Sequence, residues 1–121
     1  MQIHFKGTNY ELPAHISELA RRKIESLGKY IGKDKEVARA YADFGKESEA
    51  HKNGSFWRVD INFDVHGNRF YAKAVEESIE KALDKAVSEL AISIKTARKR
   101  EQSLMKKGGG VIKSLMRGLQ S

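Results

Sequence analysis

The sequence predicts an α+β domain in which two helices pack on one face of a four-stranded sheet, in the order β-α-β-β-β-α. Two segments repeat apolar residues at three- and four-residue spacing, the period of a half-buried helix. Four shorter segments alternate polar and apolar residues, the period of a half-buried strand. Each segment has only one apolar side, so both helices must cover the same face of one sheet. A chain of 121 residues is long enough for one such core.

The first strand and the first helix are predicted from the opening of the chain. Residues 2–6 place Ile3 and Phe5 on one side of a short strand. Pro13 suits the first turn of a helix, where an N–H group has no intrahelical partner. Gly32 is typical of the residue that ends a helix. The apolar stripe of this helix consists of Ile16, Leu19, Ala20, Ile24, Leu27 and Ile31.

Three further strands are predicted between residues 37 and 76. Residues 37–44 alternate, but their inward positions are mostly alanine, a poor strand former, so a helix remains an alternative there. After a polar loop at 48–55, residues 57–65 alternate without an exception. Residues 66–68 form a tight turn into the fourth strand. Strands two to four are expected to be antiparallel, and the first strand, joined by a crossover, to be parallel to its partner. The inward residues are Ala38, Ala40, Ala42, Phe44, Trp57, Val59, Ile61, Phe63, Val65, Phe70, Ala72 and Ala74.

The second helix is predicted from about Glu76 to near Arg100. Acidic residues lie at its start and basic residues at its end, and both placements complement the helix dipole. These elements give a folded domain at residues 1–105, followed by a flexible glycine-broken tail at 106–121. The apolar stripe of the second helix consists of Ile79, Leu83, Ala86, Val87, Leu90, Ile94 and Ala97.

The surplus positive charge lies entirely in the last third of the chain. Residues 1–80 contain 13 Lys and Arg and 13 Asp and Glu, whereas residues 81–121 contain 10 and 3, which gives the net charge of +7. A segregated basic surface on a small domain is what polyanion binding requires. The alternative is a solvated helix face with a solubilising tail.

Side-by-side packing of the helices would join their basic residues into one surface, on the helices and not on the sheet. Long cationic side chains suit a phosphate backbone and do not read bases, so we expect folded RNA to be recognised by its shape. The candidate RNA-binding residues are Arg22, Lys23, Lys29, Lys81, Lys85, Lys95, Arg98, Lys99 and Arg100.

Catalytic and metal chemistry are not supported by the residues present. The chain contains no cysteine, and no glycine-rich phosphate loop follows a strand. Asp60 and Asp64 share the solvent side of an amphipathic strand. We therefore predict no enzyme activity, no catalytic residue, no cofactor and no metal. Neither a signal segment nor a membrane span is present, which favours the cytoplasm. The four histidines lie on different elements without ligand spacing: His4, His15, His51 and His66.

Several segments together resemble a known family. Residues 1–3, 23–30, 71–74 and 79–85, with the glycine turn at Gly67, are similar to the ribosome-associated inhibitors and hibernation-promoting proteins, also called sigma-54 modulation proteins. The similarity covers roughly residues 1–100 in the same element order. Residues Lys23, Lys29 and Lys85 lie at positions that the family usually makes basic.

The resemblance implies a partner and a mechanism. Family members bind the decoding channel of the small ribosomal subunit, where mRNA and the A- and P-site tRNA anticodon stems lie, and their helices contact 16S rRNA. Binding to the small subunit or the 70S ribosome blocks translation sterically and preserves idle ribosomes. The chain departs from the family in the middle of its second helix, where Ser88, Glu89, Ile92 and Ser93 replace a denser basic run. Its charge is displaced to residues 95–100.

The tail leaves other functions open. Residues 108–121 are too short for the dimerisation domain of long family members, so the chain resembles a short form. Its tail residues could dock on a protein, or on an anionic membrane with the help of Lys113 and Arg117, although we expect no membrane partner. A general binder of double-stranded RNA is a third candidate. The apolar tail residues are Val111, Ile112, Leu115, Met116 and Leu119.

Overall fold

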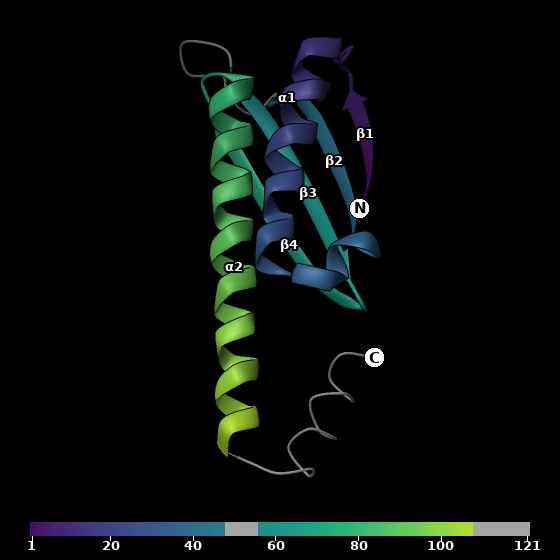
Figure 1. The fold of residues 1–121 in the computed structure, drawn as a ribbon. Coiled ribbons are helices and arrows are strands. Elements are labelled where there is room, and N and C mark those ends of the chain that lie inside the picture. The colour runs from purple at the N-terminus through teal and green to yellow at the C-terminus, as the bar shows by residue number, and fades with distance from the viewer. Residues whose placement is uncertain (48–55, 108–121) are drawn as a thin grey trace.

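Two α-helices lie side by side across one face of a four-stranded sheet (Figure 1). The computed structural model describes residues 1–47 and 56–107. The predicted order β-α-β-β-β-α is confirmed, with two short 3₁₀ helices after the first α-helix. The elements are β1 (Gln2–Thr8), α1 (Ala14–Glu25), η1 (Ser26–Tyr30), η2 (Gly32–Glu36), β2 (Arg39–Lys46), β3 (Trp57–Val65), β4 (Asn68–Glu76) and α2 (Ile79–Lys107).

The strands are arranged in the sheet in their sequence order, β1-β2-β3-β4. β1 is parallel to β2, as the crossover through α1 requires, and the other two pairs are antiparallel. His66 (φ 51°) and Gly67 (φ 81°) join β3 to β4, and both have positive φ angles. Two such residues are typical of a type I′ turn, whose twist matches that of the strands it connects.

The alanine-rich segment is a strand, so the helical alternative for residues 37–44 is wrong. β2 begins at Arg39, and Ala40, Ala42 and Phe44 are buried on the side that faces the helices. Alanine has a weak preference for strands, but pairing on both edges and burial of one face decide the structure here. Val37 precedes the strand and is 52% exposed.

The core lies between the sheet and the two helices. α2 packs over β3 and β4, where β3 supplies bulky side chains and β4 supplies alanines. Every buried residue of the described chain is apolar or glycine, and none of the described buried side-chain nitrogen or oxygen atoms lacks a hydrogen bond. The largest fully buried side chains are Phe44, Phe63, Ile24, Leu27, Ile61, Leu83, Leu90, Ile94 and Val59.

The first helix is shorter than its apolar stripe predicts. α1 ends at Glu25, and the chain continues as 3₁₀ turns through Leu27 and Ile31, which remain buried. The Ser26 hydroxyl donates a hydrogen bond to the Lys23 carbonyl at 2.5 Å, a bond that competes with regular helix geometry. The apolar stripe of the first helix therefore predicts correctly which residues are buried, but the segment is an α-helix only as far as Glu25.

The second helix begins later and ends later than predicted. β4 extends to Glu76, and the Ser78 hydroxyl accepts a hydrogen bond from the Lys81 N–H at 3.1 Å, which caps the helix. α2 then continues to Lys107 and projects beyond the sheet (Figure 1). Because of this projection Ala97 is exposed rather than part of the core, whereas Ala82 is fully buried. The predicted tail at 106–121 begins too early, because residues 106 and 107 belong to α2. The predicted loop at 48–55 and the rest of the tail, residues 108–121, lie outside the described residues.

Candidate nucleic-acid interface

The basic residues of the two helical segments meet at Tyr30, the last residue of η1. The Lys29 Nζ atom lies 5.1 Å from the centroid of the Tyr30 ring, and the Lys95 Nζ atom of α2 lies 5.3 Å from it. Both distances are in the range of cation–π attraction. The aromatic ring thus holds two ammonium groups, from segments far apart in the sequence, in one place.

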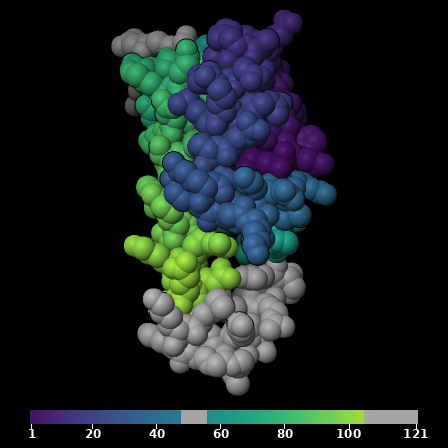
Figure 2. All heavy atoms as spheres, viewed as in Figure 1, coloured from purple at the N-terminus to yellow at the C-terminus, as the bar shows by residue number. Residues whose placement is uncertain are grey.

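Lys99 lies one helical turn beyond Lys95 and extends this basic group along α2. Lys29, Lys95 and Lys99 are exposed, and within residues 1–47 and 56–104 none of them makes an ion pair. We call these three residues the Tyr30 cluster. Figure 2 shows that the helices adjoin in one continuous surface on this side of the molecule. An unpaired ammonium group in water remains available to a phosphate.

The basic residues near the start of α2 are paired with carboxylates. Lys23 of α1 lies 2.5 Å from Asp84 of α2 (Nζ to Oδ1), which links the two helices. Lys81 contacts Glu77 at 2.5 Å, and Lys85 contacts Glu76 at 3.4 Å. The hydrogen bond from Lys81 lowers the pKa of Glu77, and the same bond raises the pKa of Lys81. We call Lys23, Lys81 and Lys85 the paired set.

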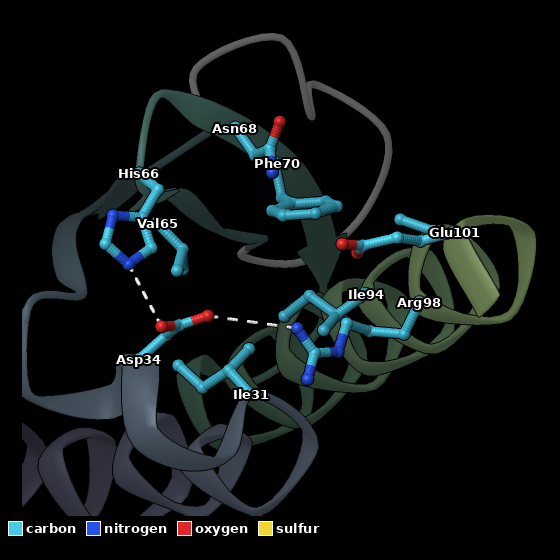
Figure 3. Close-up of a pocket in the computed structure, with 10 residues that line it drawn as sticks. Ile31, Asp34, Val65, His66, Asn68, Phe70, Ile94, Arg98 and Glu101 are labelled. Carbon is cyan, nitrogen blue, oxygen red and sulfur yellow. Dashed lines mark hydrogen bonds and ion pairs between the residues drawn. The ribbon is translucent and has the colours of Figure 1, made fainter. Parts of the chain in front are cut away.

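Arg98 is held by a contact between three parts of the fold (Figure 3). The Asp34 carboxylate of η2 lies 3.0 Å from His66 Nε2 in the β3–β4 turn and 3.8 Å from Arg98 Nη1 of α2. These groups border a depression of about 80 Å³ that Glu101 also lines. Arg98 therefore fastens α2 to the end of the sheet and has a carboxylate partner within the protein.

The nine predicted RNA-binding residues do not form one patch. Lys81 and Lys99 are separated by 18 positions of α2, a distance of about 27 Å at the rise of an α-helix. The structure brings Lys29 and Lys95 together, places Lys99 beside them, and pairs Lys23, Lys81, Lys85 and Arg98 with acids. Arg22 and Arg100 are exposed without an ion pair to any described residue. A role in RNA binding stays a prediction for all nine.

Two residues of this region escaped sequence reasoning. Tyr30 carries no charge, so the charge pattern does not mark it as a binding residue. Its position between two apolar stripe residues and beside Lys29 is the signal that could have indicated a role in the interface. Lys35 of η2 lies with Lys29 and Lys33 around a depression of about 530 Å³. Lys35 lies beyond Gly32, where the predicted helix ends, and is therefore absent from the predicted RNA-binding residues. The apolar spacing does not reveal the two 3₁₀ helices that place Lys35 beside Lys29.

No metal or membrane feature accompanies the interface in the described part of the chain. Residues 1–47 and 56–107 contain no group of three or more metal-ligating side chains. Among the helices of the same residues, none combines the length and the hydrophobicity needed to cross a bilayer.

Comparison with solved structures supports the fold. The structure is similar to the N-terminal domain of Protein Y from Thermus thermophilus, with a TM-score of 0.67 and 21% identity over 79% of this chain and 98% of that chain. It is also similar to a ribosomal subunit interface protein from Coxiella burnetii, with a TM-score of 0.67 and 16% identity over 82% and 99%. At these identities the likeness shows the shared fold.

Comparison with family models identifies the sequence. No curated protein sequence matches the chain. One family model, described as "Sigma 54 modulation protein / S30EA ribosomal protein", matches residues 3–102, which is most of the chain and all eight elements up to the projecting end of α2. The resemblance drawn from the sequence is therefore confirmed, and the chain belongs to this family of ribosome-associated proteins.

Proposed function

We propose that this protein binds the decoding channel of the small ribosomal subunit through its helix face and thereby blocks translation in idle ribosomes. Its family consists of ribosome-binding modulation factors and not of enzymes, which supports the ribosome as the partner. The observation that carries the proposal is the Tyr30 cluster, three exposed and unpaired ammonium groups from two segments that pack together.

The binding chemistry follows from the charges. Each lysine that neutralises a phosphate releases condensed counterions, so binding through the Tyr30 cluster weakens as salt rises. Lysine contacts with phosphates carry no sequence information, so the partner is recognised by the placement of its phosphates, as in folded 16S rRNA. Arg22 and Arg100 are further exposed cations that make no ion pair with a described residue.

The inhibition is steric and needs no catalytic group. α2 is a continuous helix of 29 residues, about 43 Å long, and it projects beyond the sheet as a rod. A rigid body of this size in the decoding channel excludes mRNA and the tRNA anticodon stems. We place the protein in the cytoplasm, where its partner lies, and the tail at residues 108–121 remains a predicted docking segment.

The proposal is tested with purified 30S subunits and 70S ribosomes in a sucrose gradient. The unmodified protein is expected to co-sediment with ribosomal particles and to inhibit translation of a reporter mRNA. The variant K29E/K95E/K99E is expected to lose binding by at least tenfold, a loss of about 1.4 kcal/mol or more. Its circular dichroism and melting temperature report whether the fold is retained.

A matched control carries the same change of charge on the opposite side of the molecule. Lys6, Arg39 and Lys73 lie on the face of the sheet that the helices leave open, and all three are exposed. The variant K6E/R39E/K73E should bind ribosomes within threefold of the unmodified protein, because the ribosome is proposed to contact the helix face and not the sheet. Equal loss in both variants would mean that net charge alone governs binding. Retained binding by the folded K29E/K95E/K99E variant would refute the proposal.

A general RNA-duplex binder is separated from this function by competition. A 20-base-pair RNA duplex at tenfold molar excess over ribosomes should not displace the protein. Displacement by the duplex would support the general binder and contradict a site specific to the ribosome.

A further inference from the structure

The face of the sheet that the helices leave open carries one row of planar side chains across all four strands. The strand register places His4 of β1 opposite Tyr41 of β2, Tyr41 opposite Asn62 of β3, and Asn62 opposite Tyr71 of β4. Tyr41 is 46% exposed and Tyr71 is 57% exposed, among the most exposed large side chains with apolar surface in the described residues. Large rings left in water on a regular sheet indicate a surface that is covered by something else.

The rings are arranged for stacking. The imidazole of His4 and the ring of Tyr41 are stacked, with centroids 5.0 Å apart and planes inclined by 10°. Tyr41 and Tyr71 lie two strands apart, about 10 Å at the usual strand spacing. Between them lies a shallow depression of about 530 Å³, bordered also by Asn62 and Asp60. This spacing leaves room for a flat group beside each ring.

A hydrogen-bond network fixes the floor of this surface. The Tyr71 hydroxyl donates to Asp60 Oδ1 at 2.5 Å, and Arg58 lies between Asp60 and Asp43 and bonds to both. On β1 the Thr8 hydroxyl donates to Asp43 at 2.8 Å, so the network crosses all four strands. The hydrogen bond to Asp60 raises the pKa of Tyr71, which keeps its hydroxyl protonated. Tyr71 is therefore held in one orientation before any ligand arrives.

On this face the two central strands carry three acids, and cations lie on both edge strands and also on the central strands, at Arg39 and Arg58. The register runs Lys6, Asp43, Asp60, Lys73 on one side of the planar row. On the other side it runs Gln2, Arg39, Asp64, Arg69, so Arg39 lies on the central strand β2. Lys6, Arg39 and Lys73 make no ion pair to any described side chain. The unpaired cations attract phosphates, and the carboxylates on the central strands offer acceptors to amino groups.

We propose that this open face binds unstacked bases of single-stranded RNA. Bases would stack on Tyr71 and on the His4–Tyr41 pair, the carboxylate of Asp60 and the amide of Asn62 would meet base edges, and Lys6, Arg39 and Lys73 would meet the backbone. Base stacking on aromatic rings above a cationic groove is a general mode of single-strand binding. Charge complementarity favours RNA over a peptide, because each nucleotide joins a flat base to a negatively charged phosphate, and this surface places aromatic rings beside cations. The site is distinct from the Tyr30 cluster and does not depend on its role.

The experiment measures fluorescence anisotropy of a labelled hexaadenylate, at low salt, with the full chain. An abasic oligonucleotide of the same length is the matched probe, since it has the phosphates without the bases. We expect hexaadenylate to bind at least tenfold more tightly than the abasic probe. Equal affinity for the two probes would overturn the proposal, because it would show that phosphates alone are bound.

Variants locate the binding on the molecule. Y41L/Y71L removes both rings and should weaken hexaadenylate binding at least tenfold, whereas Y41F/Y71F keeps the rings and should bind within threefold of the unmodified protein. K29A/K95A/K99A should retain the preference for the base-containing probe. A Y41L/Y71L protein that still prefers that probe tenfold would contradict the proposal, as would loss of the preference in K29A/K95A/K99A.

The proposed ribosome binding is read separately. Y41L/Y71L should still co-sediment with 30S subunits, because both substitutions lie on the sheet and leave the helix face unchanged. The two experiments therefore report on the two proposed sites separately. Failure of hexaadenylate binding with intact co-sedimentation refutes the open-face site alone.

Discussion

The two halves of α2 differ in what their side chains contact. Residues 79–94 bury one or two apolar residues per turn against the sheet, and the basic residues between them, Lys81 and Lys85, are paired with carboxylates. Residues 95–104 reach the end of the sheet, where Arg98 is paired with Asp34, and continue past it; Ala97 is exposed, and Lys95, Lys99 and Arg100 make no ion pair with the described residues. One helix thus holds the fold at one end and presents available charge at the other. A count of basic residues does not show this division.

The largest expected effect is on stability and belongs to the first half. Leu90 is fully buried, and L90A should lower the free energy of unfolding by about 2–5 kcal/mol, because it leaves a cavity in the core. Q102A in the projecting half should change it by less than about 0.5 kcal/mol, since Gln102 is exposed. Urea denaturation followed by circular dichroism measures both. Similar losses in the two variants would remove the distinction between the halves.

The next largest effect is on ribosome binding and distinguishes paired from unpaired lysines. K29A/K95A/K99A should weaken binding to 30S subunits at least tenfold, because it removes available phosphate contacts. K23A/K81A/K85A removes the same number of charges but only from the paired set, and should weaken binding less than threefold. Titration by filter binding at several salt concentrations gives both affinities. A larger loss of affinity in K23A/K81A/K85A than in K29A/K95A/K99A would show that the paired lysines, and not the Tyr30 cluster, contact the ribosome.

A smaller effect is expected from freeing one cation in each half. D34N releases Arg98 near the Tyr30 cluster and removes a negative charge, so ribosome binding should become two- to threefold stronger. D84N releases Lys23 beside the first half and should leave the affinity unchanged. Both ion pairs are partly exposed, so each substitution should cost less than about 1 kcal/mol of stability. Tighter ribosome binding by D84N than by D34N would contradict the claim that the end of α2 near the Tyr30 cluster is the half that contacts the ribosome.

The smallest effect is a titration within the paired set. The hydrogen bond and charge of Lys81 lower the pKa of Glu77, so the stabilising contribution of Glu77 is present above the pKa of the unfolded chain. This contribution is lost as the pH falls through the lower pKa of the folded state. NMR titration of the Glu77 side chain should show the lowered value, and K81Q should restore the ordinary one. An ordinary Glu77 pKa in the unmodified protein would show that Lys81 is not paired with Glu77 in solution.

The fold could be predicted from the sequence because, at almost every element, the spacing of apolar residues matches the side that is buried in the structure. The alternation at 57–65 predicts β3 with its bounds, and the separate alternation at 37–44 correctly predicts that Ala40 and Ala42 are buried. The end of α1 could not be predicted, because the apolar spacing is satisfied equally by an α-helix and by the 3₁₀ turns that Ser26 and Gly28 introduce. Periodicity shows which side is buried, but it does not show how tightly the backbone winds.

For the candidate site, the sequence predicts which residues are basic but not which of them lie together or remain unpaired. The sequence gives the number of basic residues on each helix, but ion pairs such as Lys23 with Asp84 depend on how the helices are aligned. The row from His4 to Tyr71 was missed for the same reason. Its members are spread over four strands, and only the register brings them to one line. No local motif in the sequence marks a feature of this kind.

The strand order has a consequence for how the chain folds. β2, β3 and β4 form a meander of successive hairpins, so their pairing closes short loops, whereas the pairing of β1 with β2 closes a loop of about 30 residues through α1. Short loops cost less chain entropy in the transition state for folding. We therefore expect the meander to form the folding nucleus and β1 to dock after it. Substitutions in the β3–β4 hairpin should then slow folding, while substitutions that weaken β1 should leave the folding rate nearly unchanged and accelerate unfolding.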